Sequence, residues 1–266
     1  MNLRIGLDLG STLIKVVFVD DEELIWRGLA PTAPGQEKIA ARLMEEGRGA
    51  LGLSDDNFKA GLVSTGYGRN LFQAADLKID EISAGSLGAF KRSGGKARNV
   101  LNIGGQDIKA LRITENGRIA GFKMNDKCAA GTGRFFEAAA RILDTPLEDL
   151  GPLSKLADEE VELNSTCVVF AETELVSLLA KGVKRESIIK ALNASVANRA
   201  IGLLERETAR DGLWLDGGPA MNSGLIMAFE DALMTEVTAL PEPLYTVAYG
   251  AAVSLACFPL DTNHKR

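Results

Sequence analysis

The sequence predicts an α/β fold in which one strand pattern occurs twice. Residues 7–19 (LDLGSTLIKVVFV) and residues 101–113 (LNIGGQDIKALRI) each contain an apolar strand, a glycine turn and a second apolar strand. A third strand follows each copy after a short turn, and helical patterns follow later. Short buried strands that alternate with helices are typical of α/β proteins. We therefore predict a duplicated domain with a cleft between the copies; the alternative is two unrelated hairpins in one α/β protein.

The bulk properties describe an ordinary soluble chain. Its 266 residues suit one large domain or two smaller ones. A net charge of −6 argues against nucleic-acid or anionic-membrane partners. There is no apolar run of membrane-spanning length and no signal peptide before the first strand, so we expect a cytoplasmic protein. The only histidine, His264, lies in a polar tail, which argues against histidine-based acid–base chemistry.

The expected elements divide the chain into two domains. The first covers 1–95 and receives a returning helix from 241–266, and the second covers 96–240. An Asn-Gly hairpin turn is expected at Asn116-Gly117. The segments expected to be strands are 3–8, 13–19, 23–29, 60–65, 99–104, 108–114, 118–124 and 213–218.

Helices are expected mainly after Phe135. Breaks are expected at Thr145-Pro146 and Gly151-Pro152, because proline and glycine interrupt helical patterns. The segments expected to be helical are 36–53, 80–92, 134–143, 169–181, 184–207, 223–234 and 246–257.

The first glycine turn, DLGST at 8–12, has the composition of a phosphate-binding loop. Gly10 lets the backbone approach a phosphate closely, and the hydroxyls and amides of Ser11 and Thr12 can donate to it. Lys15, on the returning strand, can neutralise a phosphoryl oxygen. Asp8 ends the strand and is a candidate for holding Mg²⁺, often through its waters.

The second glycine turn, IGGQD at 103–107, repeats this arrangement. Gly104 and Gly105 allow the same close approach. We expect Asp107 to face Asp8 across the cleft and to share Mg²⁺ with it. Either Gln106 or Asp107 is the candidate for orienting the attacking water, and the sequence does not choose between them.

A third glycine turn, DGGPAMN at 216–222, leads into a helix and suits an adenosine moiety. Gly217, Gly218 and Asn222 are the candidate contacts. The three turns in this order resemble the phosphate-1, phosphate-2 and adenosine loops of the actin, Hsp70 and sugar-kinase superfamily. This resemblance implies duplicated ribonuclease-H-like domains with ATP in the cleft between them.

Two of the three cysteines have unusual surroundings. Cys128 follows Asn125-Asp126-Lys127 and precedes Gly131-Thr132-Gly133, and Cys167 follows Asn164-Ser165-Thr166. Each stands before an expected helix, whose N-terminal amides favour a thiolate. Buried cysteines are usually small apolar filler, and Cys257 in its apolar helix fits that description. Two thiols per chain would make four ligands in a symmetric dimer, as an iron–sulfur cluster on the two-fold axis requires.

The motifs STGYGRN, NIGGQDIK, NDKCAAGTGRF and STCVVFAE, with the later Gly-Gly turn, resemble ATP-dependent activators of 2-hydroxyacyl-CoA dehydratases. These belong to one ATPase family with the ATP-binding subunits of benzoyl-CoA reductase. The resemblance covers about residues 3–257. It implies a homodimer with one oxygen-sensitive, bridging [4Fe-4S] cluster, and Cys128 and Cys167 match the ligand positions.

The resemblance also implies an electron path. The family takes an electron from ferredoxin or flavodoxin, and ATP hydrolysis drives it at low potential into the partner dehydratase or a related reductase. Gly131, Thr132 and Gly133 lie in the same stretch as Cys128, so we expect them to contact the nucleotide while the cysteine holds iron.

Two other functions remain open. A small-molecule kinase of this fold would need an acid to activate the acceptor hydroxyl, and Asp126 is the only candidate that we find. A regulatory ATPase would bind ATP without iron. The intact NDKCAAGTGRF motif favours the activator over both.

Overall fold

The computed structural model describes residues 2–53, 60–125, 131–163, 168–205 and 212–257. The chain divides into two compact units. One comprises Met1–Lys96, Thr114–Ile119 and Leu244–Arg266, and the other comprises Ala97–Ile113 and Ala120–Pro243. No helix in the described ranges is both long enough and apolar enough to cross a bilayer.

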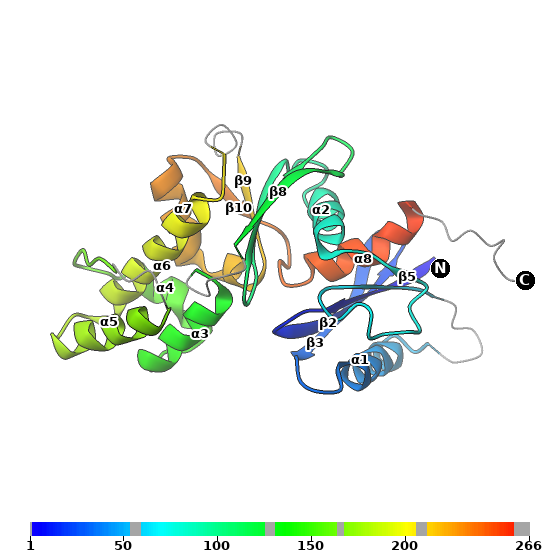
Figure 1. Cartoon of the computed structure of the whole chain (residues 1–266), viewed down its shortest axis with the longest axis horizontal. Helices are drawn as coiled ribbons and strands as arrows, with labels where there is room; N and C mark the ends of the chain where they lie inside the picture. The colour runs from blue at the N-terminus through cyan, green and yellow to red at the C-terminus, as the bar shows by residue number, and fades with distance from the viewer. Residues whose placement is uncertain (1, 54–59, 126–130, 164–167, 206–211, 258–266) are drawn as a thin grey trace, which may run out of the picture. The chain divides into compact units, whose positions relative to one another are not determined.

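The first unit is a five-stranded sheet with helices on both faces (Figure 1). Its strand order is β3-β2-β1-β4-β5, with β1 antiparallel to β2 and parallel to β4. The strands are β1 (Leu3–Leu9), β2 (Leu13–Asp20), β3 (Glu23–Pro31), β4 (Gly61–Thr65) and β5 (Leu77–Lys78), and the helices are α1 (Gln36–Ala50), α2 (Glu81–Arg92) and α8 (Thr246–Cys257).

The alternation of side chains along β2 explains why helices cover both faces of the first sheet. Val16 and Phe18 belong to the apolar cluster that includes α1, whereas Val17 and Val19 pack against α8. Successive strand residues point to opposite faces, so a run of apolar residues requires a helix on each side. Glycines permit α8 to approach closely: a Cβ on Gly6 would lie 1.8 Å from the Ala248 carbonyl oxygen.

The second unit is also built on a five-stranded sheet, in the order β10-β9-β6-β7-β8. One large core joins its central strands to its helices, with Phe135 and Phe229 fully buried. The strands are β6 (Asn99–Ile103), β7 (Ile108–Ile113), β8 (Ile119–Asn125), β9 (Leu213–Asp216) and β10 (Val237–Ala239). The helices are α3 (Gly133–Ile142), α4 (Leu150–Ser154), α5 (Val168–Ala180), α6 (Arg185–Ile201) and α7 (Ser223–Leu233), with short 3₁₀ turns η2 (Leu147–Asp149) and η4 (Gly218–Met221).

The two sheets have the same topology, which confirms the predicted duplication. When β6 is matched to β1, β7 and β8 match β2 and β3, and β9 and β10 match β4 and β5. The turns also match in detail. The Gly10 amide donates to the Leu13 carbonyl at 3.2 Å, and the Gly104 amide donates to the Asp107 carbonyl at 2.9 Å.

Two expectations about helices were wrong. α6 ends at Ile201 and not at 207, because Gly202 is the C-cap and glycine is a poor helix former. The expected break at Gly151-Pro152 instead lies inside α4, since the first turn of a helix tolerates proline. The short strands β5 and β10 were not predicted, because two or three residues carry too little periodicity.

Candidate nucleotide site

The β1–β2 turn of the first unit is held from outside by Thr32, which follows β3. The Thr32 hydroxyl donates to the Gly10 carbonyl at 2.8 Å. The Thr32 amide donates to the Thr12 carbonyl at 2.9 Å. Ser11 and Thr12 are partly exposed at the tip of the turn. Thr32 therefore holds the carbonyls of both Gly10 and Thr12 in this predicted phosphate loop.

Asp8 lies beneath this turn and is only 2% exposed. Its Oδ2 accepts a hydrogen bond from Lys15 Nζ at 2.8 Å, and the two residues are register partners in β1 and β2. Its Oδ1 is buried without a hydrogen-bond partner among the described residues. A buried carboxylate oxygen is costly when it is left unpaired. This atom is therefore suited to accept from a ligand or from a metal-bound water.

Thr65, at the end of β4, lies beside Asp8 in the parallel register. The residue is fully buried, and its Oγ1 also lacks a hydrogen-bond partner among the described residues. Gly66 follows with φ of 85°, and a Cβ there would lie 2.6 Å from Asp8 Oδ1. Glycine suits this position, because it adopts the backbone readily and has no Cβ to clash with that oxygen.

The β6–β7 turn of the second unit carries Gly104, Gly105 and Gln106 between two buried strands, and the Gln106 side chain is exposed. Asp107 is 5% exposed and accepts from Lys109 Nζ at 2.6 Å. The side chain of Lys109 is itself only 5% exposed, so this ion pair is buried. The turn thus places glycine backbone next to a carboxylate whose charge is balanced by Lys109.

The N-terminus of α3 is attached directly to this turn. The Gly133 amide donates to the Gly104 carbonyl at 2.8 Å, and the Arg134 amide donates to the Gly105 carbonyl at 3.1 Å. A Cβ on Gly133 would lie 3.3 Å from both the Gly104 carbonyl oxygen and the Gly105 Cα, so a glycine suits this close approach. Thr132, the N-cap of α3, is fully buried. The structure therefore brings Gly104, Gly105 and Gly133 together.

The third turn, after β9, is a close contact between backbones. Gly217 has φ of 87°, and a Cβ there would lie 2.2 Å from the Ile103 carbonyl oxygen. Gly218 begins the 3₁₀ turn that leads to α7. Asp216 Oδ2 accepts from Asn102 Nδ2 at 2.7 Å, which ties this strand end to β6.

Asn222 caps α7 with its side chain. Its Oδ1 accepts from the amides of Gly224 and Leu225, and its Nδ2 donates to Asn193 Oδ1 at 2.9 Å. These bonds satisfy the orphan amides at the start of the helix. The side-chain atoms are thus already occupied, so Asn222 supports the predicted adenosine loop by fixing its end.

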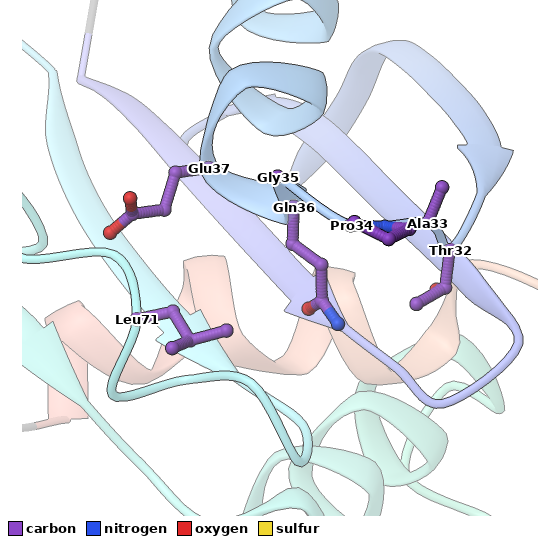
Figure 2. Close-up of a pocket in the computed structure, with 7 residues that line it drawn as sticks. All are labelled: Thr32, Ala33, Pro34, Gly35, Gln36, Glu37 and Leu71. Carbon is purple, nitrogen blue, oxygen red and sulfur yellow. The ribbon is translucent and has the colours of Figure 1, made fainter.

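A hollow of about 540 Å³ lies next to the first-unit turn (Figure 2). It is lined by the segment Thr32–Glu37 and by Leu71. Figure 2 shows the Gln36 side chain extending from the start of α1 into the space between Thr32 and Leu71. Since Thr32 bonds to the Gly10 and Thr12 carbonyls, this hollow borders the predicted phosphate loop.

The predicted cluster ligands Cys128 and Cys167, and also Asp126, lie outside the described residues. Among the residues that are described, no group of three or more His, Cys, Asp or Glu side chains is placed to hold a metal ion. Cys257 ends α8.

Sequence reasoning missed three residues of these turns: Thr32, Thr65 and Asn102. The duplicated pattern contained a signal for Asn102, because LNIGG aligned with LDLGS places it opposite Asp8. Thr65 lies in STGYGRN, but its position beside Asp8 depends on strand pairing. Thr32 reaches the turn from 22 residues away, and nothing in its local sequence indicates this contact.

Comparison with known proteins identifies close relatives over nearly the whole chain. The activator of lactoyl-CoA dehydratase from Anaerotignum propionicum is 40% identical over 261 residues, which is 94% of this chain and 95% of the relative. A solved structure of the activator of 2-hydroxyisocaproyl-CoA dehydratase from Clostridium difficile, with bound ADPNP, has a TM-score of 0.85 at 36% identity. That alignment covers 94% of this chain and 93% of the other.

Component A of (R)-2-hydroxyglutaryl-CoA dehydratase from Acidaminococcus fermentans has a TM-score of 0.88 at 36% identity, covering 95% of this chain and 97% of that one. A glucokinase of the ROK family from Streptomyces griseus shares the fold, with a TM-score of 0.52 at 15% identity over 94% of this chain and 98% of that one. The predicted fold class is therefore confirmed. The model of the BadF/BadG/BcrA/BcrD ATPase family matches residues 5–254, and the chain belongs to this ATPase family.

Proposed function

We propose that this protein is an ATP-dependent activator that delivers an electron, at low potential, to a partner 2-hydroxyacyl-CoA dehydratase or a related iron–sulfur reductase. Its electron donor is a ferredoxin or a flavodoxin, and its working form is a homodimer. The proposal is supported by relatives that are named as dehydratase activators and by the ADPNP bound to one of them.

The observation that carries this proposal is the attachment of α3 to the β6–β7 turn. The amides of Gly133 and Arg134 donate to the carbonyls of Gly104 and Gly105. A nucleotide phosphate that moves this turn also moves the start of α3. Cys128 lies five residues before Gly133, so a change at the turn reaches the cysteine segment through a short stretch of chain.

The second cysteine has a related connection. Cys167 immediately precedes α5, and α5 packs against α3 in the same unit. Both helices that follow the cysteines therefore belong to one packed layer. This supports a single response of the two cysteine segments to the nucleotide.

The donor set fits a cluster. Cys128 and Cys167 supply two thiolates per chain and four per homodimer, which is the number that a [4Fe-4S] cluster uses. When bound, such a cluster carries one electron at a time. The chain's own part is to hold the thiolates and to change their surroundings with the nucleotide state, since exposure and hydrogen bonding set the reduction potential.

The phosphate turns fit ATP and Mg²⁺. The free Oδ1 of Asp8 suits the hydration shell of Mg²⁺, and Asp107 is a second buried carboxylate at a glycine turn, with its charge balanced by Lys109. Lys15 and the Ser11-Thr12 turn would bind phosphate oxygens. Gly217-Gly218 would support the adenosine moiety, and Gln106 or Asp107 would orient the attacking water.

Anaerobic purification tests the redox part of the proposal. Wild-type protein should contain four iron and four sulfide per dimer and give an EPR signal after reduction. Cys128→Ala and Cys167→Ala should each lose the iron and the signal while ATP hydrolysis persists. Cys257→Ala is the matched control and should keep both.

Iron-free wild-type protein from an anaerobic preparation would overturn the activator function. A kinase or a regulatory ATPase would then be favoured. These two are separated by adding hydroxyl or carboxyl acceptors, because only the kinase would turn over ATP in response.

A further inference from the structure

Asp8 and Thr65 form a pair of neighbouring buried oxygen groups. They are register partners on the adjacent parallel strands β1 and β4, so their side chains lie on the same face of the sheet. Asp8 is 2% exposed and Thr65 is fully buried. Neither Asp8 Oδ1 nor Thr65 Oγ1 has a hydrogen-bond partner among the described residues.

The second unit has a directly hydrogen-bonded pair of side chains at the same place. Asn102 and Asp216 are the register partners on β6 and β9, which match β1 and β4. There the Asn102 amide donates directly to Asp216 at 2.7 Å. The first unit has the carboxylate on the central strand and a hydroxyl beside it, and makes no such bond. Two buried oxygens left open at one point require a further hydrogen-bonding group.

The described neighbours of Asp8 do not occupy Oδ1 with a hydrogen bond. Lys15 holds the other oxygen of Asp8, Oδ2, so Oδ1 remains free. Gly66 has no Cβ to fill the space next to Oδ1. Oδ1 can only accept when the carboxylate is ionised, whereas a threonine hydroxyl both donates and accepts. Water satisfies both atoms at once, as buried waters commonly do.

We propose that Thr65 is a positioning residue of the ATPase: its hydroxyl and Asp8 Oδ1 together hold one water molecule at the phosphate turn. This inference rests on the proposed ATP site and is independent of the cluster. The water is either a ligand of Mg²⁺ or a free water next to the phosphates. Both sources donate to Asp8, and the experiment below distinguishes them.

The test compares Thr65→Val with Thr65→Ser in the full-length protein. Valine keeps the shape and loses the hydroxyl, so ATP turnover should fall about tenfold or more, as expected for a hydrogen bond linked to a charged group. Serine should keep at least about half of the wild-type rate. Nucleotide affinity, measured by calorimetry with ADP, should change by less than about twofold in either variant.

The unfolding temperature provides a second measurement, because Thr65→Val should not lower it even though it lowers ATP turnover. The proposed water is held by the nucleotide-bound site, so without nucleotide the Thr65 hydroxyl lacks this partner, and Thr65→Val should unfold at the same temperature as wild type or higher. A merely structural hydroxyl would instead lower the unfolding temperature and leave turnover intact. Should valine prevent folding, Thr65→Ala against Thr65→Ser gives the same comparison.

The dependence of ATP turnover on Mg²⁺ concentration then shows whether the water is a Mg²⁺ ligand or a free water. If it is a Mg²⁺ ligand, the Mg²⁺ concentration for half-maximal turnover rises several-fold in Thr65→Val; if it is free, that concentration is unchanged. Wild-type turnover in Thr65→Val, or equal losses in the valine and serine variants, would overturn the role of Thr65. Wild-type protein without any ATP turnover would instead contradict the proposed function itself.

Discussion

The two predicted phosphate turns share a closing backbone hydrogen bond, but different parts of the chain hold their glycine carbonyls. Each is closed by a glycine amide that donates three residues ahead, from Gly10 to Leu13 and from Gly104 to Asp107. In the first unit, the Thr32 side chain holds the Gly10 carbonyl. In the second, the backbone at the start of α3 holds the matching Gly104 carbonyl. The second attachment involves Gly133, five residues after Cys128 in the sequence, so we expect the second turn to be the one coupled to the predicted cluster.

The ion pairs next to the two turns also differ. Lys15 and Lys109 occupy matching positions, opposite Asp8 and Asn102 respectively. Lys15 pairs with the strand residue Asp8, whereas Lys109 pairs with Asp107 in the turn. The duplication therefore preserves the hydrogen bond that closes each predicted phosphate turn and varies the ion pairs next to it.

The largest effect on stability is expected at two glycines, one in each unit, whose backbone closely approaches a carbonyl group of a neighbouring strand. Gly217→Ala and Gly66→Ala each force a Cβ to within 2.7 Å of a backbone carbonyl oxygen. With the positive φ, each should lower the free energy of unfolding by more than about 3 kcal/mol, measured by urea denaturation. Gly182→Ala is the control, because it has φ of 83° but open space around it. It should cost about 1 kcal/mol; similar losses in all three variants would argue against a close approach.

An intermediate effect is expected from breaking the attachment of α3. Gly133→Pro removes the amide that donates to Gly104, and the proline ring would clash with that carbonyl, so the start of α3 must separate from the turn. Iron content and ATP binding should remain, while the ATP-induced change in the EPR spectrum should be lost. Gly133→Ala keeps the amide, and its Cβ, 3.3 Å from the Gly104 carbonyl oxygen, requires only a small shift, so this variant should keep most of the change.

Thr32→Val removes the matching attachment in the first unit. It should weaken ATP binding several-fold, as expected for one lost hydrogen bond, without uncoupling nucleotide from cluster. Loss of the spectral response in both variants would remove the distinction between the two turns.

The smallest effect concerns two helix caps. Asp80 caps α2, and Asn222 caps α7. Burial acts to raise the pKa of Asp80, but hydrogen bonds from the Ser83 amide and hydroxyl outweigh it, so this pKa is lowered from 3.8. The folded form therefore favours the carboxylate, and the cap's contribution is complete above the unfolded pKa and lost as pH falls through the folded one.

Asp80→Ala should cost about 1 kcal/mol at pH 7, and the difference from wild type should shrink below about pH 4. Asn222→Ala should show a cost that does not vary with pH, because the amide does not titrate. Denaturant titrations between pH 7 and pH 3 check both. A constant difference for Asp80→Ala would contradict the charged cap.

Much of the fold was readable from local pattern. The alternating strands and glycine turns predicted the duplication, and the apolar runs located most helices. The pattern failed at Gly151-Pro152, because a proline in the first helical turn resembles a break. It also failed for β5 and β10, whose few residues are strands only because a neighbouring strand pairs with them.

The sequence by itself determined the positions of the glycine turns and of most strands along the chain, because close backbone approach and strand alternation require particular residue types at fixed spacing. Only the tertiary structure decided which groups meet. The hydrogen bonds from Gly133 to Gly104 and from Thr32 to Gly10, and the position of Thr65 beside Asp8, join residues that are 22 to 57 positions apart. Such contacts are set by strand register and helix docking, which no local pattern specifies.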